Sequence, residues 1–341
     1  MINMSNCLEK VIGREDLSAS EMREVMHYFM SGQASDSQMA GFLCALRSKG
    51  ETVEEMIAAA EVLRELASPM PMADTHLIDT CGTGGDGAHT FNISTTSAFV
   101  VAAAGGRVAK HGNRSVSSLC GSADVLELAG VNLNLSAQQV VQCIQTLGIG
   151  FLFAPRYHSA MQHTRQVRRT LGVRTLFNLL GPLCNPAGAK HQLIGVYDQK
   201  WVVPLAQVFK QLGSRHVLVV NAHDGLDEIT LTGVTHVAEL KDQSIVTYQI
   251  TPEQFGITAT SLASIAINTP QESLALLQAV LANQACAAKD IVVLNAGAAI
   301  YAADLVDTLA DGMMKAQAVI SDGSAYQKFH DFVAYTQQFT S

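Results

Sequence analysis

The chain has 341 residues and a formal net charge of −8, and this acidic balance excludes a general nucleic-acid binder, which needs a basic surface. Hydrophobic residues make up 48% of the chain and charged residues only 15%, which excludes a disordered protein and predicts a compact one with a large core. At this length we expect one large domain with a smaller one attached.

The first seventy residues predict three short helices. Apolar residues recur at helical spacing in the first of them, at Met22, Val25, Met26, Phe29 and Met30. Capping-box sequences at residues 35–38 and 52–55 predict the starts of the next two. Pro69 and Pro71 end the segment.

Strand, loop and helix alternate after residue 76, which predicts an α/β domain. Short strands are expected at residues 77–78 and 108–109, with a helix of small residues from about Ser94 between them. Later strands are expected at residues 149–153, 192–196, 216–220, 245–250 and 291–294.

This alternation divides the chain into a helical domain, residues 1–72, and an α/β domain, residues 73–341. Residues 155–188 interrupt the alternation, because two proline-containing loops flank a polar helix. We expect this segment to rejoin the helical domain and to bound a cleft opposite a glycine-rich loop. Clefts between domains are common ligand sites.

The glycine-rich loop follows the first expected strand, at residues 79–87, and reads D-T-C-G-T-G-G-D-G. Thr90, Asn92, Ser94 and Thr95 come next, at the head of the expected helix. Glycine lets the backbone approach an anion, successive N–H groups can point at phosphate oxygens, and a helix N-terminus adds positive potential. The loop matches neither of two common nucleotide-binding glycine patterns. By itself it fits a phosphate site and an ordinary turn about equally.

A second polar loop, residues 110–118, reads K-H-G-N-R-S-V-S-S and favours the phosphate interpretation. It places two cations, an amide and three hydroxyls directly after a strand. Lys and Arg neutralise a diphosphate, while Ser and Asn side chains orient it. Ser122 either caps the next helix or adds a phosphate contact, and capping is the simpler interpretation.

Adjacent carboxylates, Asp227 and Glu228, follow the apolar strand at residues 217–220. Magnesium needs only one or two protein carboxylates when substrate phosphates and water complete its coordination shell. The pair is therefore a candidate magnesium site, and an ordinary acidic turn is the alternative.

The seven cysteines include no C-x-x-C pair, which predicts reduced thiols in a cytosolic protein and no thiolate metal site. The first residues lack a basic-then-apolar signal pattern, and no apolar run reaches membrane-spanning length. We therefore expect a cytoplasmic protein with no membrane partner and no nucleic-acid partner.

These motifs occur in one order with R-T-L-F-N-L-L-G-P-L-C-N-P at residues 174–186. In this combination the chain resembles the anthranilate phosphoribosyltransferase family of tryptophan biosynthesis over nearly its whole length. The resemblance implies a nucleoside phosphorylase/phosphoribosyltransferase-type α/β fold: a small N-terminal helical domain and a larger domain whose mostly parallel central sheet is flanked by helices. It also implies transfer of a phosphoribosyl group from phosphoribosyl diphosphate to anthranilate, a requirement for two Mg²⁺ ions, and a homodimer.

The resemblance also implies three sets of site residues. The diphosphate donor would contact Gly82, Gly85, Asp86, Thr90, Asn92, Ile93, Ser94, Thr95, Lys110, His111, Gly112, Asn113, Arg114, Ser115, Val116, Ser117, Ser118 and Ser122. Anthranilate would contact Gly82, Asn113 and Arg168. The metal ligands would be Ser94, Asp227 and Glu228. The candidate catalytic residues are Lys110, Arg114 and His111, with the two cations stabilising the leaving diphosphate and His111 serving as a positioning residue rather than a base.

Two alternative functions stay open. A pyrimidine nucleoside phosphorylase has a related fold, but its chemistry gives no reason for the Asp227 and Glu228 pair. A non-enzymatic nucleic-acid-binding relative of the same fold would have a basic surface, whereas this chain is acidic. The sequence neither indicates nor excludes an amidotransferase partner.

The chain departs from the family pattern at two places beside the expected site. Residues 157–162 read Y-H-S-A-M-Q where the family pattern is closer to H-P-A-M-K, so Ser159 and Gln162 are unusual. Asn221 and Ala222 precede the H-D-G segment where His-Gly is frequent. These departures concern the geometry of anthranilate entry and of the loop before the metal carboxylates. Neither of them removes an expected ligand.

Overall fold

Four helices begin the chain in the computed structural model, which describes residues 3–70, 72, 76–115 and 119–339. They are α1 (Met4–Ile12), α2 (Ala19–Met30), α3 (Asp36–Lys49) and α4 (Val53–Leu66). The prediction of three helices was wrong because it missed α1, along which Met4, Cys7 and Val11 are buried at helical spacing. The predicted capping boxes of α3 and α4 are confirmed.

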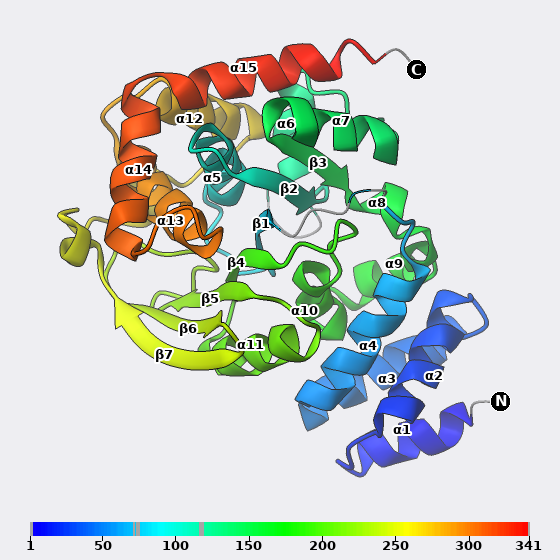
Figure 1. Ribbon diagram of the computed structural model, residues 1–341. Helices are drawn as coiled ribbons and strands as arrows, with labels where there is room; N and C mark the ends of the chain where they lie inside the picture. Colours follow the sequence, from blue (N-terminus) through cyan, green and yellow to red (C-terminus); the bar gives the residue numbers. More distant parts are fainter. Residues whose placement is uncertain (1–2, 71, 73–75, 116–118, 340–341) are drawn as a thin grey trace.

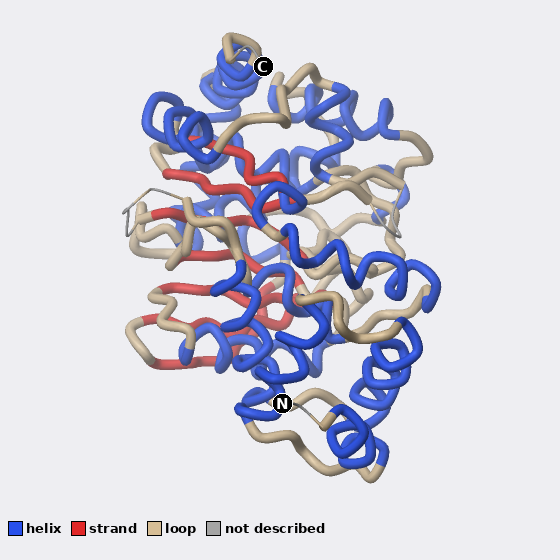
Figure 2. The backbone as a smooth tube through the Cα atoms, turned by 90° about the vertical axis from the view of Figure 1, so that its right-hand side faces the viewer, coloured by secondary structure: helices blue, strands red, loops and turns tan. Residues whose placement is uncertain are grey.

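A seven-stranded sheet forms the centre of the larger part of the molecule, in the order β3-β2-β1-β4-β5-β6-β7 (Figures 1 and 2). The strands are β1 (Leu77–Gly82), β2 (Arg107–Gly112), β3 (Ile149–Phe153), β4 (His191–Gly195), β5 (His216–Ala222), β6 (Thr235–Lys241) and β7 (Ser244–Ile250). The first five strands run parallel, and β6 and β7 add an antiparallel hairpin at one edge. The mostly parallel central sheet is therefore confirmed.

Helices flank the sheet, as Figure 1 shows. Beyond the N-terminal group they are α5 (Ile93–Ala103), α6 (Ser122–Leu128), α7 (Ala137–Leu147), α8 (Ala154–Tyr157), α9 (Gln162–Leu171), α10 (Leu176–Leu183), α11 (Val202–Gln211), α12 (Pro270–Leu281), α13 (Ala287–Ala302), α14 (Leu309–Ser321) and α15 (Ser324–Thr336). Short 3₁₀ helices span Ser159–Met161, Gln199–Trp201, Pro252–Phe255 and Leu262–Ser264. None of the helices in the described part of the chain has both the length and the apolar character needed to cross a bilayer.

Alternate residues of β5 enter two different cores. Leu218 and Val220 lie in the core that contains α5 and α13, whereas Val217 and Val219 lie in the core that contains α1 to α4 and α11. A strand buried on both faces needs this continuous apolar run, because successive side chains point to opposite faces. The N-terminal helices are thus joined to the sheet through shared packing, and α9 and α10 also pack against them.

One expected strand is part of a helix. Residues 291–294, I-V-V-L, lie inside α13 and are almost completely buried. The segment looks like a strand because β-branched residues dominate it, and a helix buried all round has no polar face to give it a helical period. The prediction also missed β6, whose Thr235 to Lys241 pair residue by residue with β5 and β7.

Candidate active site

The carboxyl ends of the parallel strands lie side by side, and the polar loops follow these ends. β1 ends at Gly82, β2 at Gly112 and β4 at Gly195, and Gly82 pairs with Gly195 across the sheet. Crevices at these ends are the usual ligand sites of open α/β sheets. The topology therefore brings the glycine-rich loop, the loop after β2 and the Asp227 loop together.

The backbone of Asp227 lies against the ends of β1 and β4. A Cβ on Gly195 would collide with the carbonyl of Asp227, and one on Gly82 would collide with its carboxylate. That carboxylate accepts a hydrogen bond of 2.6 Å from the N–H of Gly84. Glycine is required at these two strand ends because the acidic loop packs directly on them.

Three carboxylates crowd together at this point. Burial raises the pKa of Asp227 to about 7, with the neighbouring Asp86 adding to the effect. Burial also raises the pKa of Glu228, with Asp227 adding to the effect and Lys110 partly opposing it. Mg²⁺ prefers oxygen ligands, and a divalent cation relieves the repulsion between neighbouring carboxylates. The set of Asp86, Asp227 and Glu228 therefore suits a magnesium site. Asp86 was expected only as a contact of phosphoribosyl diphosphate.

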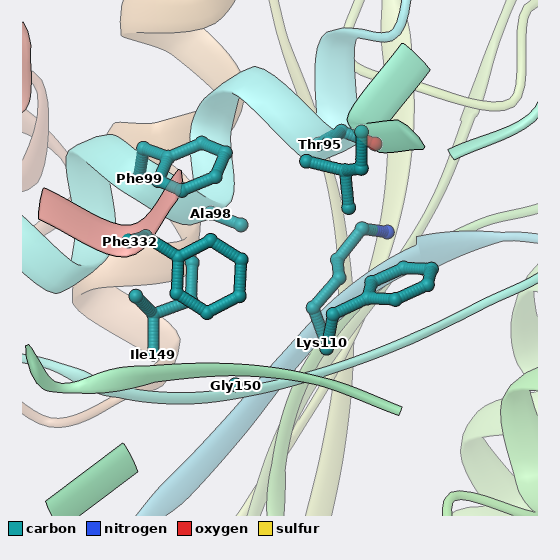
Figure 3. Close-up of a pocket in the computed structure, with 9 residues that line it drawn as sticks. Thr95, Ala98, Phe99, Lys110, Ile149, Gly150 and Phe332 are labelled. Atoms are coloured by element: carbon teal, nitrogen blue, oxygen red, sulfur yellow. The ribbon is translucent and has the colours of Figure 1, made fainter. Parts of the chain in front are cut away.

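Lys110 reaches this acidic group from β2. Its ammonium donates to the carbonyl of Thr80 and lies 3.3 Å from the hydroxyl of Ser94, near the start of α5. The stem runs beside Thr95 and an apolar cavity of about 10 Å³, and its charged end points away from Ile149 and Phe332 (Figure 3). The cavity is too small for a substrate, so its walls fix the lysine stem and leave the charged end at the candidate site.

The start of α5 is held by its neighbours. Asn92 donates to the Cys120 carbonyl at 3.2 Å and accepts from Ser273 at 2.7 Å. Thr90 forms a bridge with Ala266, while Ile93 and Thr95 are buried at the first turn. These contacts fix the helix N-terminus, and the free N–H groups of a helix's first turn are able to bind an anion.

His111 is buried below the same loops. The N–H of His111 donates to Asp79 at 3.1 Å, and its ring lies 5.3 Å from the ring of His158. Burial lowers the pKa of His111 to about 3, with His158 and Lys110 adding to the effect. The Nε2 atoms of both histidines are buried without a hydrogen-bond partner in the described part of the chain. His158 was missed as a candidate, although the unusual segment 157–162 contains it.

Arg114 points to carboxylates on α6. Its guanidinium pairs with Glu127 at 2.7 Å and Asp124 at 3.1 Å, and these hydrogen bonds raise its pKa. Asp124 also accepts from the N–H of Ser115 at 3.0 Å. Arg114 is thus apart from the three-carboxylate group in this conformation. Val116, Ser117 and Ser118, three expected donor contacts, lie outside the described residues.

Two neighbouring expectations concern the loop after β2. Ser122 is not a helix cap: it is the first residue of α6, Gly121 occupies the N-cap position, and the Ser122 hydroxyl donates to the Asn113 carbonyl at 3.3 Å. The capping interpretation was therefore wrong. Asn113 is exposed and its side chain accepts from the N–H of Arg114 at 2.7 Å, while Gly112 ends β2 directly before it.

Arg168 lies on α9, a helix that packs against α2 and α3. Its guanidinium sits over the Phe177 ring at 5.5 Å, and burial lowers its pKa. Within the described ranges it forms no ion pair with a carboxylate. A half-buried cation in this position suits an anionic ligand.

Arg174 is a site residue that the sequence reasoning missed. It lies between α9 and α10, and its guanidinium donates to the carbonyl of Gly85 and stacks over the Tyr197 ring at 4.3 Å. Its own carbonyl accepts from Arg47 of α3 at 2.8 Å. Arg174 therefore connects the N-terminal helices to the glycine-rich loop. The only signal in the sequence was its place at the head of the 174–186 motif.

The unusual Asn221 has a structural role. It is buried, and its side chain donates to the carbonyl of Val196 at 2.6 Å, which ties the end of β5 to the residue after β4. Beyond the acidic pair, the N–H of Ile229 donates to Asn295 of α13 at 2.9 Å. The loop that carries Asp227 is thus fixed at both ends.

Comparison with known proteins gives the class first. Residues 5–67 match the helical bundle domain of a glycosyl transferase family, and residues 74–326 match the a/b domain of the same family. The two matches together cover most of the chain and define a glycosyl transferase with these two parts.

Individual relatives narrow the class. An anthranilate phosphoribosyltransferase of Methylococcus capsulatus is 60% identical, with 98% of each chain covered. Another from Hydrogenovibrio crunogenus is 54% identical over 99% of this chain and all of the relative. The chain belongs to the anthranilate phosphoribosyltransferase family. The resemblance seen in the motifs is therefore confirmed.

Solved structures agree. The anthranilate phosphoribosyltransferase of Thermus thermophilus superposes with a TM-score of 0.91 at 41% identity, covering 97% of this chain and 99% of the other. The Saccharomyces cerevisiae enzyme in complex with phosphoribosyl diphosphate and Mg has a TM-score of 0.90 at 25% identity, with 98% of both chains covered.

Proposed function

We propose that this protein transfers the 5-phosphoribosyl group from phosphoribosyl diphosphate to the amine of anthranilate, releasing diphosphate. The observation that carries the proposal is the convergence of Asp86, Asp227 and Glu228 with Lys110 and the start of α5 at one edge of the sheet. This arrangement has both an anion-binding helix end and a set of metal ligands, which a magnesium diphosphate needs together.

The donor site comprises the glycine-rich loop, the start of α5 and the loop after β2. Gly82, Gly85 and Asp86 would meet the diphosphate through backbone N–H groups and bound magnesium. Ser94, Asp227, Glu228 and the added Asp86 would hold Mg²⁺, as two ions. When bound, magnesium neutralises charge on the leaving diphosphate.

The protein's own groups have defined roles in the reaction. Lys110 adds a positive charge where the leaving diphosphate gains negative charge, and the N–H groups of α5 do the same without moving. The amine of anthranilate attacks C1 of the ribose from the opposite side, so the configuration at that carbon inverts. An aromatic amine is already a neutral nucleophile and loses one proton to water after the C–N bond forms, so no strong base is required, and a His111 with a pKa of about 3 is a poor base at neutral pH.

The acceptor site lies between α9 and the loop after β2. Arg168, which lacks a carboxylate partner in the described ranges, would bind the carboxylate of anthranilate. Gly82 and Asn113 would complete the contacts.

The first test is the loss of anthranilate fluorescence when the protein is mixed with phosphoribosyl diphosphate and Mg²⁺. Rapid loss that requires every component and fails in Arg168→Ala would support both the reaction and the role of Arg168. Arg169→Ala is the matched control, because Arg169 is the next residue on α9, is exposed, and bonds only to Gln166 in the described part of the chain. Binding of phosphoribosyl diphosphate without loss of fluorescence would show that anthranilate is not the acceptor.

Phosphorolysis of pyrimidine nucleosides is the alternative reaction, and no observation on the site favours it.

We further propose a cytoplasmic homodimer, joined through the N-terminal helices, with residues 1–72 and the 155–188 segment acting as a helical domain. Light scattering that shows a stable monomer at working concentration would remove the dimer.

A further inference from the structure

The amino ends of β4 and β5, opposite the candidate active site, carry a second cluster of side chains that can bind a metal ion. His191 is the first residue of β4 and His216 the first of β5, and the two pair directly across the sheet. Asp304, in the turn after α13, completes the cluster, and one potential ligand atom from each lies within 4.8 Å of the others. The candidate active site lies at the other ends of these strands, roughly 13 Å or more away at about 3.3 Å per residue.

We propose that His191, His216 and Asp304 form a binding site for a divalent transition-metal ion, with zinc as the best match. Two imidazoles and a carboxylate are a common zinc ligand set, and the fourth position is open to water. Nδ1 of His191 donates to the carbonyl of Ala302 at 2.8 Å, so an ion bound at this atom would take the place of that proton.

The distances within the cluster point to a shared ion. One oxygen of Asp304 lies 2.6 Å from Nδ1 of His216, and the other lies 3.6 Å from Nδ1 of His191. A single carboxylate thus faces both imidazoles through the same ring atom. Both histidine side chains are 1% exposed, whereas that of Asp304 is 43% exposed. The aspartate side is therefore the route by which an ion enters.

The groups behind His216 resemble the outer shell of a metal site. Nε2 of His216 lies 3.0 Å from Glu239, whose carboxylate also accepts from Tyr301 at 2.7 Å and from Tyr248 at 2.8 Å. A metal-binding histidine typically donates its second ring N–H to a carboxylate, which fixes the ring and its tautomer. Nδ1 of His216 lies 2.6 Å from Asp304, a hydrogen-bond distance, so a metal ion bound between the two would replace the shared proton and move them slightly apart.

Charge counting supports a dication. The cluster contains two carboxylates, Asp304 and Glu239, and within the described ranges neither forms an ion pair with a lysine or an arginine. A divalent ion with two neutral imidazoles balances both negative charges. A proton on His216 alone balances only one.

The test is titration of the chelator-treated full chain with Zn²⁺ by calorimetry and with Co²⁺ by visible absorption. We expect one tight equivalent and the intense absorption of tetrahedral Co²⁺, which octahedral oxygen sites such as the magnesium carboxylates do not give. Asp304→Asn should abolish this equivalent, and Glu239→Gln should weaken it about 10- to 100-fold. Asp307→Asn, an exposed aspartate three residues away, is the matched control and should bind normally.

Phosphoribosyl transfer with Mg²⁺ should stay unchanged in Asp304→Asn, so the two sites can be judged separately. Absence of tetrahedral Co²⁺ absorption in the wild-type protein would overturn the proposal. Equal Zn²⁺ binding by the wild-type protein and Asp304→Asn would do the same, since the ion would then be elsewhere. A chelator-treated Asp304→Asn that is folded and melts at the temperature of the chelator-treated wild-type protein makes either result decisive.

Discussion

Replacing Arg174 tests whether the N-terminal helices control the glycine-rich loop. The guanidinium holds the Gly85 carbonyl and covers the Tyr197 ring at 4.3 Å, so Arg174→Ala removes two contacts that hold the loop in place. The backbone of residue 174 remains bound to Arg47. The variant should therefore fold, with the change confined to the loop.

The expected effect follows from the lost interactions. A hydrogen bond from a charged donor contributes about 1.5–3 kcal/mol, and the cation–π contact about 0.5–1 kcal/mol more. If the loop must adopt its present shape to bind the donor, the hydrogen bond alone corresponds to roughly a 10- to 150-fold higher KM for phosphoribosyl diphosphate. The KM for anthranilate should change much less, because Arg174 contacts the donor loop.

The assay is fluorescence loss at varied donor concentration. Arg174→Lys keeps the charge but loses the planar fork, so it should fall between Arg174→Ala and the wild type. Arg169→Ala controls for loss of a cation nearby. If Arg174→Ala had an unchanged KM for the donor and an unchanged kcat, the loop would be held by other contacts and the reasoning would be refuted.

Four further predictions concern the groups at the same ends of the strands. Because burial and Asp86 raise the pKa of Asp227 to about 7, and the pKa of the neighbouring Glu228 is raised as well, protons compete with Mg²⁺, so calorimetry should show Mg²⁺ affinity rising about tenfold or more per pH unit up to about pH 7; a flat profile would contradict this. The same raised pKa means that the metal-free folded protein binds an extra proton, so its melting temperature should fall as the pH rises from about 4 to about 7. His111→Gln should keep most of the turnover at saturating substrate; near-total loss with intact binding would make His111 the base. Gly195→Ala should cost roughly 1–3 kcal/mol in unfolding free energy, since its Cβ meets the Asp227 backbone, and weaken Mg²⁺ binding; a normal metal titration would disprove that contact.

Much of the fold follows from local patterns in the sequence. The capping boxes of α3 and α4 and the apolar runs of β3, β4 and β5 are local signals, and the structure confirms them. Residues 291–294 were assigned to the wrong element because burial on every side removes the polar positions that reveal a period. β6 was missed because its Thr235, His236 and Glu239 make it look polar, although most of the strand is buried by tertiary packing.

The site was predictable where one segment carries several functional groups. The glycine-rich loop, the loop after β2 and the acidic pair are each continuous in the sequence, and the structure brings parts of all three together. Arg174 and His158 were missed because their roles depend on contacts with residues far along the chain, Gly85 and His111. Arg114 shows the opposite case, since its expected anion is replaced in this conformation by Glu127 and Asp124.

β4 and β5 connect the candidate active site with the proposed metal site. These strands begin at the His191 and His216 pair and end at Gly195 and Ala222, both of which contact the Asp227 loop. A one-residue slip between them would turn every side chain to the other face. An ion held by the two histidines fixes this register at one end, and the fit of Asp227 against Gly195 requires it at the other. Loss of the proposed ion should therefore lower stability before it changes catalysis, because the active-site edge keeps its own contacts.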